Sequence, residues 1–163
     1  MSNLQKISEK IYSLNDLKIQ LQNWRDNGDS IVFTNGCFDI LHQGHIEVLA
    51  KTADLGNRLI IGLNSDSSVK LLKGENRPIN EENARTLLLC ALTFVDAVIL
   101  FSEETPFQLI SEIKPNILAK GGDYKMEDIV GHDFVQKNGG KVISIPLTDG
   151  FSSTTIIDKI QNG

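Results

Sequence analysis

The stretch that decides the fold is Thr34-Asn35-Gly36-Cys37-Phe38-Asp39-Ile40-Leu41-His42-Gln43-Gly44-His45. It lies between an apolar run at residues 30–33, typical of a buried strand, and a run at residues 46–55 that is typical of a helix. The two histidines are three residues apart, which predicts that both imidazoles lie on one face of the first helical turn. Free N–H groups and the helix dipole at that turn favour an anion. The stretch therefore predicts a phosphate site that contains two histidines.

The length, composition and net charge of the chain predict a single domain. A chain of 163 residues is long enough to bury a substantial core, and its net charge of −5 argues against a nucleic-acid-binding surface. No segment has the apolar length of a membrane span, and the polar N-terminus has no signal-peptide pattern. Cys37 and Cys90 show no metal-like spacing, which favours a reducing, cytoplasmic setting.

Strands alternate with helices along the rest of the chain. A first helix is expected from Ser13 to just before Gly28. Further short apolar strands are expected at residues 58–64, 95–101, 116–120 and 141–146. Further helices are expected at residues 65–73, 80–92, 106–114, 132–137 and 152–161. Crossovers of this length predict an α/β fold, a Rossmann-like three-layer sandwich with a five-stranded parallel sheet and helices on both faces.

The unusual residues follow strand ends, where such sheets bind their ligands. They lie at residues 36–45, 64–66, 120–124 and 149–155, and we expect these four loops to converge on one crevice. The histidine pair could instead be simple helix-capping residues, or metal ligands. No set of Cys, His or carboxylate residues nearby completes a tetrahedral zinc site, which favours the phosphate interpretation.

Two motifs then carry a family resemblance. Asn35 to Asp39 followed by His42-Gln43-Gly44-His45 resembles the HxGH signature of the nucleotidyltransferase superfamily, which is cytidylyltransferase-like. Ser152-Ser153-Thr154-Thr155 is similar to its second signature. In detail the chain resembles the bacterial D-glycero-β-D-manno-heptose 1-phosphate adenylyltransferases, whose Asn-Ser-Asp, Arg-Pro and Lys-Gly-Gly-Asp-Tyr segments also occur here in order.

The resemblance implies transfer of AMP from ATP to a heptose 1-phosphate, which gives ADP-heptose and pyrophosphate. It also implies that the reaction takes place in the cytoplasm and that the ADP-heptose is used in lipopolysaccharide biosynthesis. It implies Mg²⁺ carried mainly by the triphosphate with no dedicated protein ligands, a homodimer, and a separate sugar kinase in the same pathway. The expected organisation is an N-terminal helical segment, residues 1–29, packed on a nucleotidyltransferase domain, residues 30–163. Neither a nucleic acid nor a membrane is expected as a partner.

Two other functions stay open. One is a cytidylyltransferase acting on glycerol 3-phosphate or another polyol phosphate, although Leu147 stands where those relatives carry an arginine. The other is a non-catalytic nucleotide-binding module. The intact His42, His45 and Arg85 weigh against the latter, because binding alone needs no paired transition-state donors.

The resemblance and the loop chemistry together predict three groups of site residues. A phosphate monoester has a second pKa near ~6, so the nucleophile needs no general base, and the protein must position anions and stabilise charge. The expected catalytic residues are His42, His45, Arg85 and Lys73. The expected nucleotide-binding residues are Asn35, Gly36, Cys37, Phe38, Gly44, Gly121, Asp123, Ser152, Ser153, Thr154 and Thr155. The expected substrate-binding residues are Asp39, Asn64, Asp66, Arg77 and Lys120.

Several of these residues have simpler explanations. Asn64, Asp66 and the hydroxyls of residues 152–155 could cap helices. Asp39 could stabilise its own turn, and Cys37 could be a small buried residue.

Overall fold

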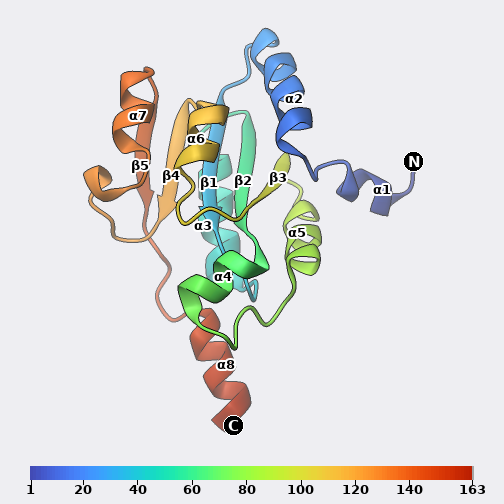
Figure 1. Ribbon diagram of the computed structural model, residues 1–163, viewed down its shortest axis with the longest axis vertical. Coiled ribbons are helices and arrows are strands. Elements are labelled where there is room, and N and C mark those ends of the chain that lie inside the picture. The colour runs from blue at the N-terminus through green and yellow to red at the C-terminus, as the bar shows by residue number, and fades with distance from the viewer. Residues whose placement is uncertain (163) are drawn as a thin grey trace.

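A five-stranded parallel sheet, in the order β3-β2-β1-β4-β5, forms the centre of the computed structural model, which describes residues 1–162 (Figure 1). Gly163, the last residue of the expected domain, lies outside the described residues. The strands are β1 (Ile31–Gly36), β2 (Arg58–Asn64), β3 (Ala97–Phe101), β4 (Ile117–Gly121) and β5 (Lys141–Ile145).

Helices connect the strands, as the alternating pattern predicts. The helices are α1 (Asn3–Ser8), α2 (Leu14–Asp26), α3 (Gln43–Ala53), α4 (Asp66–Lys73), α5 (Glu82–Cys90), α6 (Phe107–Ile113), α7 (His132–Lys137) and α8 (Ser153–Asn162), with a 3-10 turn η1 (Met126–Asp128). The sequence patterns identified each of these helices except α1. That helix is held by a local capping box between Ser2 and Gln5, and none of its residues is buried, so it leaves no apolar period to detect.

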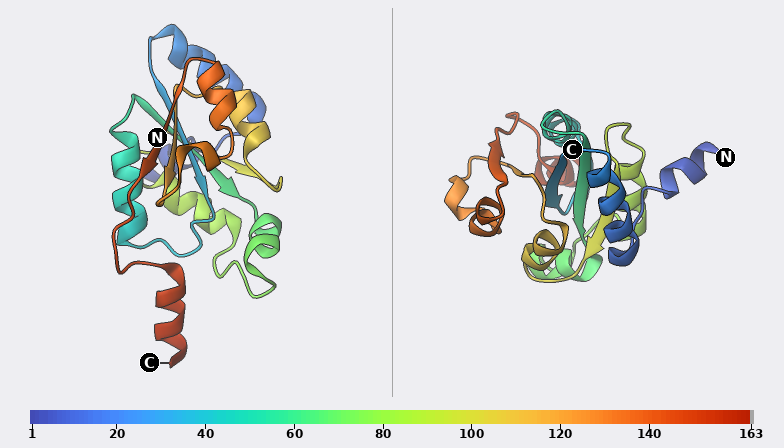
Figure 2. Two further views of the ribbon diagram at one scale, coloured as in Figure 1. Left: turned by 90° about the vertical axis from the view of Figure 1, so that its left-hand side faces the viewer. Right: turned by 90° about the horizontal axis from the view of Figure 1, so that it is seen from above.

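Alternate residues along the strands belong to two separate apolar clusters, one on each face of the sheet. On β1, Ile31 and Phe33 face the cluster built with α2, α6 and α7, and Val32 faces the cluster built with α3 and α5. A strand that buries both faces reads as a continuous apolar run, which is how these strands appear in the sequence. The predicted α/β three-layer sandwich with a five-stranded parallel sheet is therefore confirmed (Figure 2). Helix α2 adds Leu17 and Trp24 to the first cluster and so packs on the same core.

The strand order reverses between β1 and β4. The chain runs outward from β1 through β2 to β3, and α6 then returns it to β4 on the other side of β1. The β1–β4 ladder covers Val32–Ile117 and Phe33–Leu118. Connections that leave adjacent strands in opposite directions open a crevice at their carboxyl ends, so this edge is where a ligand site is expected.

Helix α8 lies apart from the sheet. It projects from the carboxyl edge, at the bottom of Figure 1, and none of its described residues is buried. Within residues 1–162, no helix combines the length and the apolar character that a membrane span needs.

Candidate active site

A cavity of about 450 Å³ opens at the carboxyl ends of β1 and β4. That volume lies within the range of about 300–1,000 Å³ that is usual for small-molecule sites. Residues from all the loops predicted to converge here line it, together with part of the loop that follows α4. The predicted residues that line it are Asn35, Gly36, Cys37, Phe38, Asp39, His42, Gly44, His45, Asn64, Lys73, Arg77, Lys120, Gly121, Ser152, Ser153 and Thr154.

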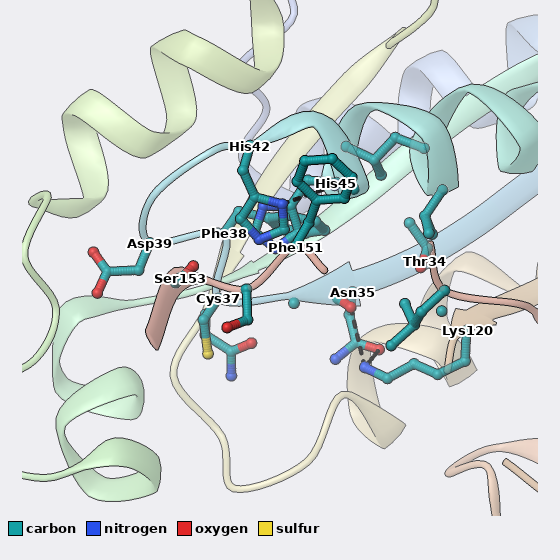
Figure 3. A pocket seen from close by; sticks show the side chains of 18 of the residues that line it. Thr34, Asn35, Cys37, Phe38, Asp39, His42, His45, Lys120, Phe151 and Ser153 are labelled. Atoms are coloured by element: carbon teal, nitrogen blue, oxygen red, sulfur yellow. Dashed lines mark hydrogen bonds between the residues drawn. The ribbon is translucent and has the colours of Figure 1, made fainter. Parts of the chain in front are cut away.

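The two histidines form a stacked pair at the start of α3. His42 is the N-cap residue, and its Nδ1 accepts a hydrogen bond of 3.4 Å from the backbone N–H of His45. The two rings lie 3.7 Å apart between centroids with 20° between their planes, and Phe151 lies nearly parallel to His42 at 6.4 Å. Figure 3 shows this pair in the middle of the cavity. The capping and phosphate-site interpretations of His42 are thus compatible, because the cap is what orients the ring.

Two glycines and one strained residue shape the histidine loop. Phe38 has a φ of +46°, a left-handed conformation that costs a non-glycine residue about 1–2 kcal/mol. This turn brings the Phe38 ring edge-on to His45, 5.3 Å between centroids. A Cβ on Gly36 would lie 2.9 Å from the Phe38 ring, and one on Gly44 would lie 3.0 Å from the Cβ of Phe151. A side chain at either position would therefore have to displace a neighbouring phenylalanine.

Burial keeps both imidazoles neutral at pH 7 in the absence of a ligand. Burial lowers the pKa of His42 below its usual value. Burial, together with repulsion from His42, lowers the pKa of His45 to about 4. A bound polyanion would oppose this effect and favour protonation, since opposite charge stabilises the imidazolium. The pair is consequently suited to respond to phosphate charge rather than to act as a permanent cation.

Lys120 lies at one end of the cavity. Its Nζ donates to the backbone oxygen and to Oδ1 of Asn35, at 3.1 and 3.2 Å, across the point where β1 and β4 part. Burial lowers the pKa of this ammonium group. Lys120 contacts no carboxylate within the described residues, so an anion can still gain from its charge.

Asp39 and Arg77 lie at the other end. Arg77 Nε donates to Asp39 Oδ2 at 2.6 Å, and the backbone N–H groups of Ile79 and Asn80 donate to the same carboxylate. Burial alone would raise the pKa of Asp39, but these hydrogen bonds and the Arg77 charge lower it, so the carboxylate is ionised. In Figure 3 the carboxylate points away from the histidines. The turn-stabilising interpretation of Asp39 therefore fits the structure, and its substrate-binding role stays a prediction.

Arg85, expected as a catalytic residue, does not line the cavity, so its catalytic role stays a prediction. Its side chain is 0% exposed, and its donors bind the carbonyl oxygens of Cys37, Asn64 and Asn80 at 2.7–2.9 Å. The remaining bond, of 2.7 Å, joins Arg85 Nη2 to Asp66 Oδ1. Arg85 is thus a positioning residue that ties the histidine loop to the ends of β2 and the loop before α5.

Three other predicted residues lie outside the cavity lining. Asp66 accepts a hydrogen bond from Arg85, and its own backbone N–H donates to Glu82 Oε2 at 2.8 Å, so its substrate-binding role stays a prediction. Asp123 is exposed beyond the glycines that end β4. Thr155 shares its hydroxyl with Ser152 at 2.7 Å in the cap of α8. Of the Ser152–Thr155 segment, the first three residues face the cavity.

The sequence reasoning missed several lining residues. Phe151, Tyr124 and Leu72 provide apolar contact area, and Glu104 and Thr148 provide polar groups. Tyr124 is the last residue of the Lys-Gly-Gly-Asp-Tyr segment, and Phe151 directly precedes Ser152. An aromatic residue at the end of a ligand loop is the signal that could have identified them. Nothing local distinguishes Glu104 from the neighbouring acidic residues of its loop.

Buried polar atoms without partners point to a ligand. Within residues 1–162, the only two buried side-chain nitrogen or oxygen atoms that lack a hydrogen-bond partner are His45 Nδ1 and Arg77 Nη2. Both residues line the cavity. Such atoms are costly, so each one needs a physical explanation.

The described residues contain no group of three or more His, Cys, Asp or Glu side chains that could hold a metal ion. A triphosphate-bound Mg²⁺ fits such a cavity, because this ion keeps several waters and needs few protein ligands. The cavity lining contains two carboxylates, Asp39 and Glu104. The Asp39 carboxylate already accepts hydrogen bonds from Arg77 and Ile79.

Fold and site together define an α/β protein of the nucleotidyltransferase type. Residues 33–159 match the family model described as cytidylyltransferase-like, and the chain belongs to this family. The resemblance drawn from the two signatures is thereby confirmed.

Within that family the chain is similar to proteins described as "Bifunctional protein HldE". It is 53% identical to the one from Rhodopseudomonas palustris (strain BisA53) over 148 residues, 91% of this chain and 30% of that protein. For Coxiella burnetii (strain Dugway 5J108-111) the identity is 49% over 152 residues, 93% and 32% of the two chains. The chain thus spans about a third of the length of these curated relatives.

A solved structure is also similar. The lipopolysaccharide core biosynthesis protein from Thermoplasma volcanium GSS1 is 33% identical, with a TM-score of 0.65 over 75% of this chain and 100% of that one.

Proposed function

We propose that this chain transfers AMP from ATP to a heptose 1-phosphate, forming ADP-heptose and pyrophosphate. The observation that carries the proposal is the stacked histidine pair at an anion-favouring helix N-terminus (Figure 3), in a cavity that Lys120 and Arg77 also line. A reaction that joins two phosphorylated substrates needs two anion subsites and a charge-stabilising centre between them. The similarity to the HldE proteins supports the heptose and the adenylyl group.

In the proposed reaction an oxygen of the sugar phosphate attacks the α-phosphorus of ATP. The new P–O bond forms as the bond from the α-phosphorus to the bridging oxygen breaks, and pyrophosphate leaves with that electron pair. The monoester nucleophile is largely dianionic at neutral pH, so no proton has to be removed. His42 and His45 donate hydrogen bonds to the transferring phosphate as its charge rises.

Other groups of the chain hold the two anions in place. Ser153 and Thr154 offer hydroxyl and N–H groups at the start of α8, which suits the β- and γ-phosphates. Lys73 ends α4 at the cavity mouth, exposed and without an ion-pair partner among the described residues, which suits a contact made on closure. Mg²⁺, if bound, would neutralise the triphosphate, with Glu104 as the available protein carboxylate.

Pyrophosphate release tests the proposal. Each of the four nucleoside triphosphates is paired with heptose 1-phosphate, glycerol 3-phosphate and a hexose 1-phosphate, with Mg²⁺ present. We expect ATP with heptose 1-phosphate to give the highest kcat/KM, and a His45→Ala variant to give almost none. Preference for CTP with glycerol 3-phosphate would replace the proposal with the cytidylyltransferase alternative. Nucleotide binding without turnover for any pair would favour a binding module.

The setting of the reaction is also a proposal. Both cysteines are free, which supports the reducing cytoplasm where ATP is available. We propose a homodimer, and a sugar kinase that supplies the heptose 1-phosphate. The word "bifunctional" in the relatives' description, and the third of their length that this chain spans, support a second activity acting alongside it.

A further inference from the structure

The side chain of Arg77 makes few hydrogen bonds for a largely buried arginine. Its side chain is 15% exposed and its partner Asp39 is 1% exposed. Arginine and carboxylate groups frequently pair through two parallel hydrogen bonds. Here the guanidinium uses Nε alone, at 2.6 Å, and Nη2 is buried with no partner. The second donor of the guanidinium is therefore not used within the described part of the chain.

The Asp39 carboxylate fixes where that unused edge lies. It also accepts from the N–H groups of Ile79 and Asn80, at 2.8 and 2.9 Å, and the Asn80 side chain donates to the Asp39 backbone oxygen at 2.7 Å. These bonds join the loop after α4 to the histidine loop. Arg77 is therefore pre-organised against the cavity before any ligand arrives, and little rotamer entropy remains to be lost on binding.

The position of this group separates it from the other cation of the cavity. Figure 3 shows Asp39, which holds Arg77, and Lys120 on opposite sides of the histidine pair. Two phosphorylated ligands that meet at the histidines would extend toward opposite ends. One end has Lys120 with Asn35, and the other has Arg77 with Asp39.

From this geometry we propose that the terminal edge of the Arg77 guanidinium binds phosphate oxygens of a substrate, and that Asp39 is the positioning residue that presents it. The planar fork of arginine matches phosphate geometry, Arg77 lines the cavity, and no described residue accepts a hydrogen bond from its Nη2. The inference rests on the proposed function only for the identity of the substrate. The phosphate can belong to the sugar phosphate or to the triphosphate, and the experiment distinguishes them.

The test compares Arg77→Gln with a matched control, Lys70→Gln. Lys70 forms an ion pair of 2.6 Å with Glu75 and so also braces the loop after α4, but it does not line the cavity. In steady-state kinetics, Arg77→Gln raises the KM of one substrate by about 10- to 100-fold, the usual loss for a charged hydrogen bond. A higher KM for heptose 1-phosphate shows that Arg77 binds the phosphate of the sugar, and a higher KM for ATP shows that it binds the triphosphate. A change below about twofold in both, or an equal rise in the control, overturns the proposal.

A second measurement does not depend on turnover. Inorganic phosphate should raise the Tm of the wild-type chain by mass action. We expect Arg77→Gln to need about tenfold more phosphate for the same increase, with Lys70→Gln unchanged. An unchanged phosphate requirement in Arg77→Gln overturns the inference, even if the chain proves to use another sugar. A chain that shows the phosphate effect but no heptose activity refutes the proposed function alone.

Asp39 is tested through Arg77. Asp39→Asn keeps an oxygen for the Ile79 and Asn80 N–H groups and loses the charge that holds Arg77 Nε. It should raise the same KM, and the Asp39→Asn/Arg77→Gln double variant should be no worse than Arg77→Gln. Additive losses would show that Asp39 acts independently. If Arg77→Gln does not fold, Arg77→Lys supplies the readout, since it keeps the charge and loses the fork, and a normal KM there would refute the role of the terminal edge.

Discussion

A substitution of Arg85 can distinguish a structural role of this residue from a catalytic one, because the two roles predict different changes in Tm and activity. Arg85→Met preserves much of the side-chain volume and removes every donor. The carbonyl oxygens of Cys37, Asn64 and Asn80 lose their partner inside the protein, and Asp66 loses its cation. An unsatisfied buried acceptor costs about 1–3 kcal/mol, and three carbonyl oxygens lose their Arg85 donor together.

We therefore expect a loss of about 3–5 kcal/mol in the free energy of unfolding. For a domain of this size, where 1 kcal/mol corresponds to about 2–4 °C, Tm should fall by roughly 6–20 °C. Asp66→Asn is the control, because the Asp66 carboxylate is 38% exposed and an ion pair with an exposed partner contributes at most about 1 kcal/mol. Thermal unfolding followed by circular dichroism measures both. A Tm within about 2 °C of wild type, with activity reduced ~10²-fold, would show that Arg85 contacts a phosphate after all.

Three further changes test the site. His42→Ala and His45→Ala should each lower kcat by about 10²–10³-fold, which is the usual effect of losing a transition-state donor. The ATP affinity measured by calorimetry should change little. Near-normal turnover in either variant would contradict the mechanism. Lys73→Ala should raise KM or lower kcat without changing Tm, because this residue is exposed at the cavity mouth, and a large loss of Tm would make it structural. The pKa of His45, about 4 in the folded chain and near 6.5 when unfolded, means that the unfolded state binds the proton first. The free energy of unfolding should thus fall by about 2 kcal/mol from pH 7 to pH 5 in urea titrations, a loss that His45→Gln should lack.

Local patterns were sufficient for the elements and for their order. The strand at residues 58–64 and the end of α4 at Lys73 agree with the structure, because apolar runs and capping residues act within a few positions. The expected helix at residues 80–92 is shorter at both ends in the structure, as Glu82–Cys90. Helix ends depend on which tertiary contacts continue the turn, and these are not visible in a periodic pattern.

The roles of the charged residues could not be read in this way. Arg85 bonds Cys37 across 48 positions, and Arg77 bonds Asp39 across 38. In the sequence both arginines are simply cations near a motif. Only the folded chain shows that Arg85 is consumed by backbone carbonyls and that Arg77 keeps an unused edge. The ring of Phe151 likewise reaches His42 only after β5 brings that loop beside α3.

By itself the sequence determined the α/β sandwich, the edge of the sheet that carries the site, and the histidine pair at a helix N-terminus. Periodicity, glycine turns and strand-end position are local properties, and parallel topology sends every strand-end loop to one edge. The tertiary structure alone decided which cations face the cavity and which are bound within the protein. That difference is set by long-range hydrogen bonds, which give every nitrogen of Arg85 a partner and leave Arg77 Nη2 and His45 Nδ1, in residues that line the cavity, without one.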